Sequence, residues 1–119
     1  MHPDTEDALP SRRYLGQLVA IRIDRPEGSR HPEHGFVYPL NYGYVPGTLA
    51  ADGEPLEAYV IGADGPLSTF AGRCVAVIHR LDDDDDKLVL VPDGHACSDE
   101  EIRLRTAFQE RFFGSVILR

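Results

Sequence analysis

The sequence predicts a mainly β protein of the α+β class, in which a small β-barrel or rolled sheet packs against one C-terminal helix. Several short strand-like runs, dense turn residues between them and one late amphipathic segment favour this class. The chain has 119 residues with 11 Gly and 9 Pro, a length that fits one domain with one core. We expect that domain over residues 16–119, after a flexible N-terminal arm at residues 1–15.

Four segments read as strands. Residues 16–24 ("GQLVAIRID") are β-branched and apolar with polar interruptions, and a turn-rich segment follows them. The other three are residues 57–62, 72–80 and 87–92. The last two are joined by "LDDDDD", which predicts a hairpin with an acidic tip. Residues 36–47 are aromatic but rich in Pro and Gly, so we expect an irregular extended segment there.

The helix is predicted over residues 99–113. Ser98 and Glu101 form an S-x-x-E capping box at its start. Gly114 is predicted to end the helix as its C′ residue. Apolar residues recur near helical spacing at Ile102, Phe108 and Phe112. The apolar tail "FFGSVILR" is expected either to complete the barrel or to be buried against a partner.

The charge balance argues against two classes of partner. With 20 acidic and 12 basic residues the net charge is -8, which argues against binding to nucleic acid or an anionic membrane. No apolar run approaches a membrane-spanning length, and the N-terminus lacks the apolar core of a secretory signal. Two cysteines, Cys74 and Cys97, favour a reducing cytoplasm over a disulfide framework. An anionic substrate would need compensating positive charge, and a bound divalent cation is one way to supply it.

Three carboxylates, Asp52, Glu54 and Glu57, lie in a stretch that is otherwise aromatic, apolar and turn-forming ("NYGYVPGTLAADGEPLEAYV", 41–60). Two carboxylates about 4 Å apart repel by roughly 4 kcal/mol at an effective dielectric constant near 20. A folded cluster therefore needs a proton, a basic group or a metal, and Mg²⁺ prefers such oxygen ligands. The alternative is a solvated acidic turn, and these three residues alone favour that alternative.

A second acidic element, residues 82–86, is followed directly by Lys87. A block of like charges is usually a solvated loop, and a hairpin tip cannot direct five side chains at one point. If this loop faces the first cluster, two or three of its aspartates could share a metal with Asp52 and Glu57.

Candidate phosphate-binding groups form a third set: Arg30, Lys87 and the hydroxyls of Tyr38, Tyr42 and Tyr44. An Arg fork suits phosphate oxygens, whereas core packing is the alternative for the tyrosines and is preferred for Tyr44. His31 and His34 could bind metal or phosphate, or transfer protons. The common nucleotide, zinc and serine-hydrolase motifs do not occur.

Residues 36–61 closely resemble the signature region of the soluble, Mg²⁺-dependent inorganic pyrophosphatases of family I, where Y-P-x-N-Y-G-Y leads to D-G-D-P-x-D. Residues 73–92 are similar to the next pair of strands in that family. The resemblance implies a five-stranded, OB-like barrel with a flanking helix, and a homo-oligomer. It also implies hydrolysis of pyrophosphate, or of a related phosphoanhydride or phosphate ester, with Mg²⁺, or alternatively Mn²⁺, as cofactor.

The resemblance also assigns roles to residues. It implies metal binding by Asp52, Glu57, Asp82 and Asp85. It implies that Glu54, with Asp52, activates the attacking water. It implies phosphate contacts from Arg30, Tyr38, Tyr42 and Lys87.

Departures from the family pattern concentrate at the substrate end. Glu54 and Glu57 replace aspartates, and Arg22 stands where the family has an early acidic residue. The "HPEH" loop replaces a lysine-bearing hairpin, and Phe112 and Phe113 replace a Tyr-Lys pair that touches phosphate. We therefore expect a metal centre that acts on a larger or less charged substrate, with His31 and His34 replacing lost phosphate contacts.

Two other functions remain open. The first is a catalytically reduced family member that binds a metal or phosphate ligand without turnover. The second is an OB-like nucleic-acid module, which the acidic balance opposes.

Overall fold

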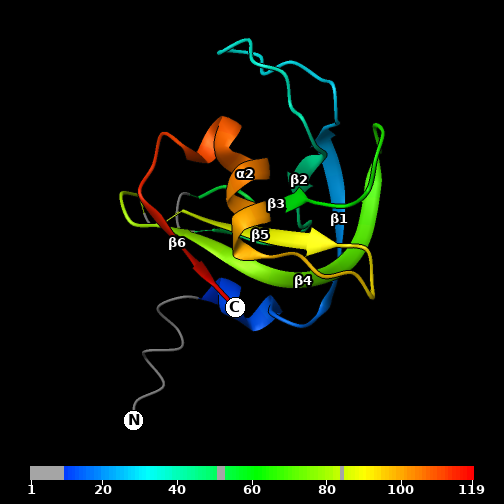
Figure 1. Cartoon of the computed structure of the whole chain (residues 1–119), viewed down its shortest axis with the longest axis vertical. Coiled ribbons are helices and arrows are strands. Elements are labelled where there is room, and N and C mark those ends of the chain that lie inside the picture. The colour runs from blue at the N-terminus through cyan, green and yellow to red at the C-terminus, as the bar shows by residue number, and fades with distance from the viewer. Residues whose placement is uncertain (1–9, 51–52, 84) are drawn as a thin grey trace.

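The structure, a computed structural model, describes residues 10–50, 53–83 and 85–119. In chain order its elements are the 3-10 helix η1 (Pro10–Tyr14), the strands β1 (Leu18–Arg25), β2 (Tyr42–Tyr44), β3 (Glu57–Val60), β4 (Thr69–Arg80) and β5 (Asp86–Val91), the helix α2 (Asp99–Glu110) and the strand β6 (Ser115–Leu118). The helix crosses one side of the sheet (Figure 1).

The sheet closes on itself. Its strand order is β1-β2-β3-β5-β4-β6, and β1 also pairs with β4, so β1 to β5 form the predicted five-stranded barrel. The β3–β5 pair is parallel, and the other pairs are antiparallel. The apolar tail forms β6, which pairs with β4 outside the ring. The predicted hairpin with an acidic tip is the β4–β5 pair.

The core lies on both sides of the barrel wall. Strand β1 alternates exposed and buried residues, which is the period of a strand with one face in the core. Every residue of β5 is buried, because one face of the strand packs in the barrel and the other packs against α2. One cluster fills the barrel around Val60, Val77 and Leu88. A second lies under α2 and joins Tyr59 and Val89 to Ile102.

The predicted start of α2 is confirmed, but its predicted end at Gly114 is wrong. Ser98 is the N-cap and accepts a hydrogen bond from the Glu101 N–H. The helix stops at Glu110, and Arg111 is its C-cap. Gly114 instead donates its N–H to Asp82 Oδ2 over 2.8 Å, a contact that ties it to the β4–β5 turn as the chain enters β6.

Part of the predicted N-terminal arm is folded onto the barrel. Residues 10–14 form η1, and the buried Ser11 hydroxyl donates a hydrogen bond to Asp86. Asp86 Oδ1 lies 2.7 Å from His79 Nδ1 on β4. Since Asp86 sits between the hydroxyl and the imidazole, this group anchors η1 and does not activate the serine. The arm as a whole, and its boundary with the domain, stay a prediction.

Cys74 and Cys97 are free thiols, both buried. Burial raises the pKa of each to about 11. Within the part of the chain that the structure describes, no helix has the length and apolar character needed to cross a membrane.

The N-cap offers a test of the helix. We expect Ser98→Ala to lower the free energy of unfolding by about 1 kcal/mol, because the Glu101 N–H loses its acceptor. Ser98→Asp should retain most of the stability, since a carboxylate also caps and complements the helix dipole. Urea unfolding would measure both variants, and equal losses would contradict the assigned cap.

Candidate functional site

One cavity, with a volume of about 730 Å³, collects most of the candidate residues. Its walls come from the end of β1, the 31–42 segment, β3, the β4–β5 hairpin and the turn after α2. The β1–β2 loop and the C-terminal end of α2 lie at the same end of the molecule (Figure 1). The lining residues are Asp24, Arg25, His31, His34, Phe36, Tyr38, Tyr42, Glu57, Arg80, Asp85, Lys87, Gln109, Arg111, Phe112 and Phe113.

Lys87, the only lysine in the chain, joins the two acidic elements. Its Nζ lies 2.5 Å from Glu57 Oε1 and 2.7 Å from Asp85 Oδ2, and its side chain is 3% exposed. The parallel β3–β5 register places Glu57 beside Lys87, and Asp85 precedes β5 by one residue. Residues 30 positions apart are thus brought together by strand pairing.

Arg80 extends this network to the helix. It donates to Glu110 through Nε over 3.0 Å and Nη2 over 2.8 Å, and its Nη1 lies 3.4 Å from Asp85 Oδ2. The Tyr59 hydroxyl donates to the same Glu110 over 2.6 Å. Burial lowers the Arg80 pKa, but the hydrogen bonds and charge of Glu110 outweigh burial and raise it. The guanidinium is therefore permanently charged beneath the cavity.

A bulge in β1 aims two charged residues into the cavity. Ile23 pairs with Gly43 and Arg25 with Tyr42, so Asp24 is the extra residue. Such a bulge re-aims side chains, as is common near active sites. The strands approach so closely here that a Cβ on Gly43 would lie 1.9 Å from the Arg22 carbonyl oxygen. Glycine is required at this position.

The bulge creates a crowded electrostatic environment. Loss of solvation raises the Asp24 pKa and repulsion from Glu57 adds to this, while Arg25 opposes it. Burial likewise raises the pKa of Tyr38 and, more strongly, that of Tyr42, and Glu57 contributes to both. Both tyrosines are therefore neutral hydroxyl donors at physiological pH.

The 31–38 segment forms an aromatic wall. The His31 ring lies 4.6 Å from His34 and 4.8 Å from Phe36, and Phe36 lies 5.5 Å from Tyr38, measured between ring centroids. His31 Nδ1 accepts N–H groups from Glu33 and His34, each over 3.1 Å. In the neutral ring the proton is therefore on Nε2, which can donate.

The structure brings seven predicted site residues to the cavity: His31, His34, Tyr38, Tyr42, Glu57, Asp85 and Lys87. It places Arg30 outside, where its Nη1 donates to the Gly35 carbonyl over 2.5 Å. Asp82 binds the Gly114 N–H instead, and Glu54 lies on the exposed loop before β3. Asp52 lies outside the described residues.

Four charged lining residues were not predicted: Asp24, Arg25, Arg80 and Arg111. The period-2 pattern of β1 breaks at Arg25, directly before Pro26, which was a usable sign of a bulge. Nothing in the sequence around Arg80 indicates that it is buried, because its partner Glu110 is 30 residues away.

In this cavity, Glu57 and Asp85 are the residues that could bind a divalent metal. Among residues 10–50, 53–83 and 85–119, no group of three or more His, Cys, Asp or Glu side chains is placed to hold a metal. However, Glu57 and Asp85 both approach one cationic centre, the Lys87 ammonium. Mg²⁺ is commonly bound by one or two carboxylates together with substrate phosphates, so this pair meets the minimal requirement.

Sequence comparison matches residues 17–112 to a family model described as inorganic pyrophosphatase. An inorganic pyrophosphatase of Gluconobacter oxydans is 34% identical over 85 residues, which are 65% of this chain and 49% of that protein. One of Pseudomonas aeruginosa is 44% identical over 59 residues, 46% of this chain and 34% of that protein. The chain thus spans about half the length, or less, of these relatives.

Solved structures of inorganic pyrophosphatases share the fold. The one from Ehrlichia chaffeensis has a TM-score of 0.66 at 20% identity and covers 85% of this chain and 84% of that chain. The one from Helicobacter pylori has a TM-score of 0.60 at 23% identity and covers 80% and 75%. At this identity the likeness establishes the barrel with its flanking helix.

Proposed function

Because the chain belongs to the inorganic pyrophosphatase family, we propose that it hydrolyses inorganic pyrophosphate, or a related phosphoanhydride or phosphate ester, with Mg²⁺ or alternatively Mn²⁺. One observation carries this proposal: a single cavity joins Glu57 and Asp85 to the cationic Lys87 and the hydroxyls of Tyr38 and Tyr42. The substrate is then a small phosphate-containing molecule. As the sequence predicts, we expect a cytoplasmic homo-oligomer.

Glu57 and Asp85 would hold the cation. Asp52 and Asp82 stay predicted ligands, and Asp82 would have to release the Gly114 N–H to take part. Asp24 adds a third carboxyl group to the same cavity wall. A bound Mg²⁺ would neutralise phosphoryl oxygens and increase the acidity of a water molecule.

The remaining polar groups orient the phosphate. Lys87 and Arg25 supply positive charge, and the Tyr38 and Tyr42 hydroxyls donate hydrogen bonds. Such fixed donors stabilise charge that develops in the transition state. Glu54 would accept a proton from the attacking water. Arg30 stays a predicted phosphate contact that must turn away from Gly35 to reach the cavity.

A second function, metal or phosphate binding without turnover, has its own support. The described residues lack a three-ligand metal group, and Lys87 already neutralises both Glu57 and Asp85. A phosphate ligand could then be bound by the basic groups alone, with no hydrolysis.

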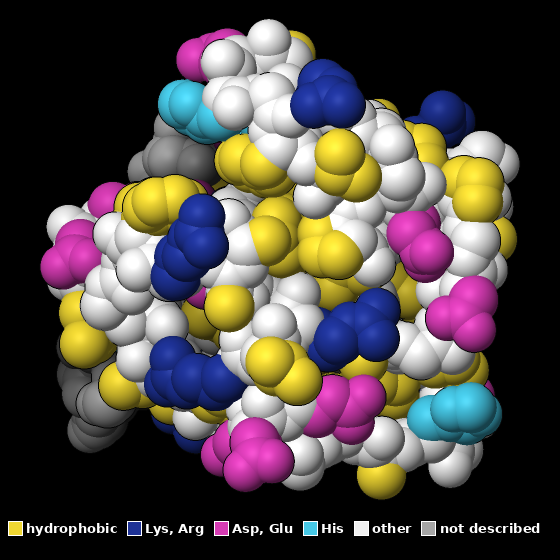
Figure 2. Space-filling model, turned by 45° about the horizontal axis from the view of Figure 1, so that its top comes forward, with side chains coloured by type: hydrophobic (Ala, Val, Ile, Leu, Met, Phe, Trp, Pro, Cys, Tyr) yellow, Lys and Arg dark blue, Asp and Glu magenta, His cyan; other side chains and the backbone are white. Residues whose placement is uncertain are grey.

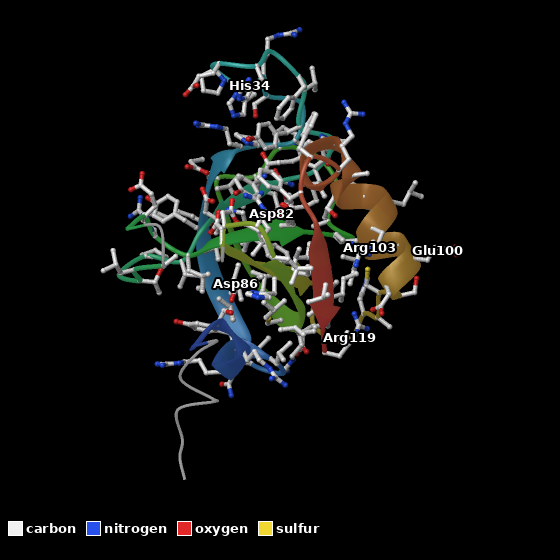
Figure 3. All side chains as sticks on the ribbon, turned by 90° about the vertical axis from the view of Figure 1, so that its left-hand side faces the viewer. His34, Asp82, Asp86, Glu100, Arg103 and Arg119 are labelled. Carbon is white, nitrogen blue, oxygen red and sulfur yellow. The ribbon has the colours of Figure 1, made fainter. Side chains whose placement is uncertain are left out.

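The test is phosphate release from pyrophosphate, nucleotides and sugar phosphates with Mg²⁺ and, separately, Mn²⁺. We expect metal-dependent turnover, and we expect Glu57→Gln to lower kcat/KM by on the order of 10²-fold, because the cavity loses one carboxylate. The matched control is Glu100→Gln. Glu100 lies on the first turn of α2 and is not a cavity residue. The cavity residue His34 lies on the loop beyond the other end of that helix (Figure 3).

Two results would count against hydrolysis. Metal binding without turnover on every substrate would favour the second function. Equal losses in Glu57→Gln and Glu100→Gln would show that the cavity carboxylate has no special role.

A further inference from the structure

We propose that the cavity accepts a nucleoside 5′-diphosphate, with the diphosphate at the Lys87 end and the base against the aromatic residues at the mouth. This inference rests on the proposed function and names the substrate class of the same site. The cavity has two chemically different ends. On the face of the molecule that Figure 2 presents, hydrophobic and basic side chains lie side by side.

The inner end is built for a diphosphate. Its buried lining residues are Lys87, Tyr38, Tyr42 and Asp85, and the half-buried Glu57 and Arg25 adjoin Lys87 and Tyr42. Inorganic pyrophosphate would need little more than these groups. The volume of about 730 Å³ lies in the range of roughly 300–1,000 Å³ that is typical of pockets for drug-sized ligands, so the cavity can hold a substituent on the diphosphate.

The outer end is aromatic. His34 and Phe36 contribute from the β1–β2 loop, and Phe112 and Phe113 from the turn after α2. Phe113 is already covered by the Arg80 guanidinium, which lies 3.8 Å from the ring centroid. Phe112 lines the cavity and is 64% exposed. An exposed aromatic ring in a pocket is a surface on which a planar group can stack.

The polar groups among these rings favour a base over an aliphatic chain. The Arg111 guanidinium lies 5.0 Å from the Phe112 ring centroid, and the His34 imidazole is solvent-exposed. A nucleobase combines a flat face for stacking with a hydrogen-bonding edge for such groups. An alkyl group would leave the Arg111 and His34 groups unpaired on binding.

Hydrolysis of this substrate balances without a further reactant. The water oxygen bonds to the β-phosphorus, and the bond from that phosphorus to the bridging oxygen breaks. The bridging oxygen leaves with the nucleoside monophosphate, and orthophosphate retains the water oxygen. The water's proton passes to a site carboxylate or to solvent.

The test uses three esters of methylenediphosphonate, which cannot be hydrolysed at the bridge: the methyl, hexyl and adenosine 5′-esters. Titration calorimetry with Mg²⁺ measures their affinities for the full chain. We expect the adenosine ester to bind about tenfold more tightly than the methyl ester, and Phe112→Ala to remove that advantage. The control is Leu104→Ala, because Leu104 is 75% exposed on α2 and is not a cavity residue.

Phosphate release from pyrophosphate and from adenosine 5′-diphosphate is measured in parallel. Adenosine and methyl esters of equal affinity, a preferred hexyl ester, or equal weakening of all three by Phe112→Ala would overturn the inference, even if pyrophosphate is hydrolysed. A preferred adenosine ester that depends on Phe112 supports the base site even if no phosphate is released. The absence of phosphate release from both substrates would refute the proposed hydrolysis but not the base site.

Discussion

Replacing Lys87 by methionine is expected to abolish turnover and to lower the free energy of unfolding by about 3 kcal/mol in the absence of divalent metal. Its ammonium is buried and lies within hydrogen-bonding distance of Glu57 and Asp85. Removing one partner of a buried ion pair leaves the other charge without compensation, which costs more than the intact pair contributes. Urea unfolding in EDTA would measure this loss.

Added Mg²⁺ distinguishes a metal site from a purely structural ion pair. With Lys87 gone, Glu57 and Asp85 have lost their shared cation, so Mg²⁺ should raise the Tm of Lys87→Met more than that of the unmodified chain. Lys87→Arg is the control, because the guanidinium group keeps the positive charge, although it is broader than the ammonium group. An identical Mg²⁺ effect on all three proteins would contradict metal binding by this pair.

Replacing Arg80 by methionine is expected to destabilise the fold by about 4 kcal/mol. Glu110 accepts two hydrogen bonds from Arg80 and is buried, so the variant would bury an unpaired carboxylate. Asp85 would lose a cation at 3.4 Å, and Phe113 would lose the guanidinium on its ring. We therefore also expect weaker substrate binding, seen as a higher KM.

A double-mutant cycle isolates the ion pair. Arg80→Met combined with Glu110→Gln should recover a large part of the stability, because the buried charge is removed along with its partner. Tyr59→Phe is the milder control, since it keeps the Arg80–Glu110 ion pair and removes the 2.6 Å hydrogen bond to Glu110 and the 2.7 Å hydrogen bond from Gln109 Nε2. It should cost about 2 kcal/mol. Additive losses in the cycle, measured by chemical unfolding, would show that the two residues are not coupled.

Local patterns predicted the framework because they report on local structure. The alternation of β1 indicated one buried face, and the "LDDDDD" segment indicated the turn between β4 and β5. Ser98 marked the start of α2, because an N-cap is formed by neighbours in sequence. The aromatic signature over 36–61 led to the family, which the family model matches over residues 17–112.

The site itself was decided by contacts between distant segments. The sequence placed Phe112 on an apolar helix face, but the helix ends at Glu110 and Phe112 lines the cavity. Of the two predicted hairpin ligands, Asp85 reaches Lys87 whereas Asp82 binds Gly114. Two aspartates of the same turn thus have different binding partners.

By itself the sequence determined four of the strands, the hairpin, the helix start and the family, because periodicity, capping and the signature motif are properties of short segments. Only the tertiary structure decided which charges meet. The β1 bulge turns Asp24 and Arg25 inward, and the parallel β3–β5 register sets Lys87 between Glu57 and Asp85. Barrel closure fixes these registers, and closure depends on all five strands together.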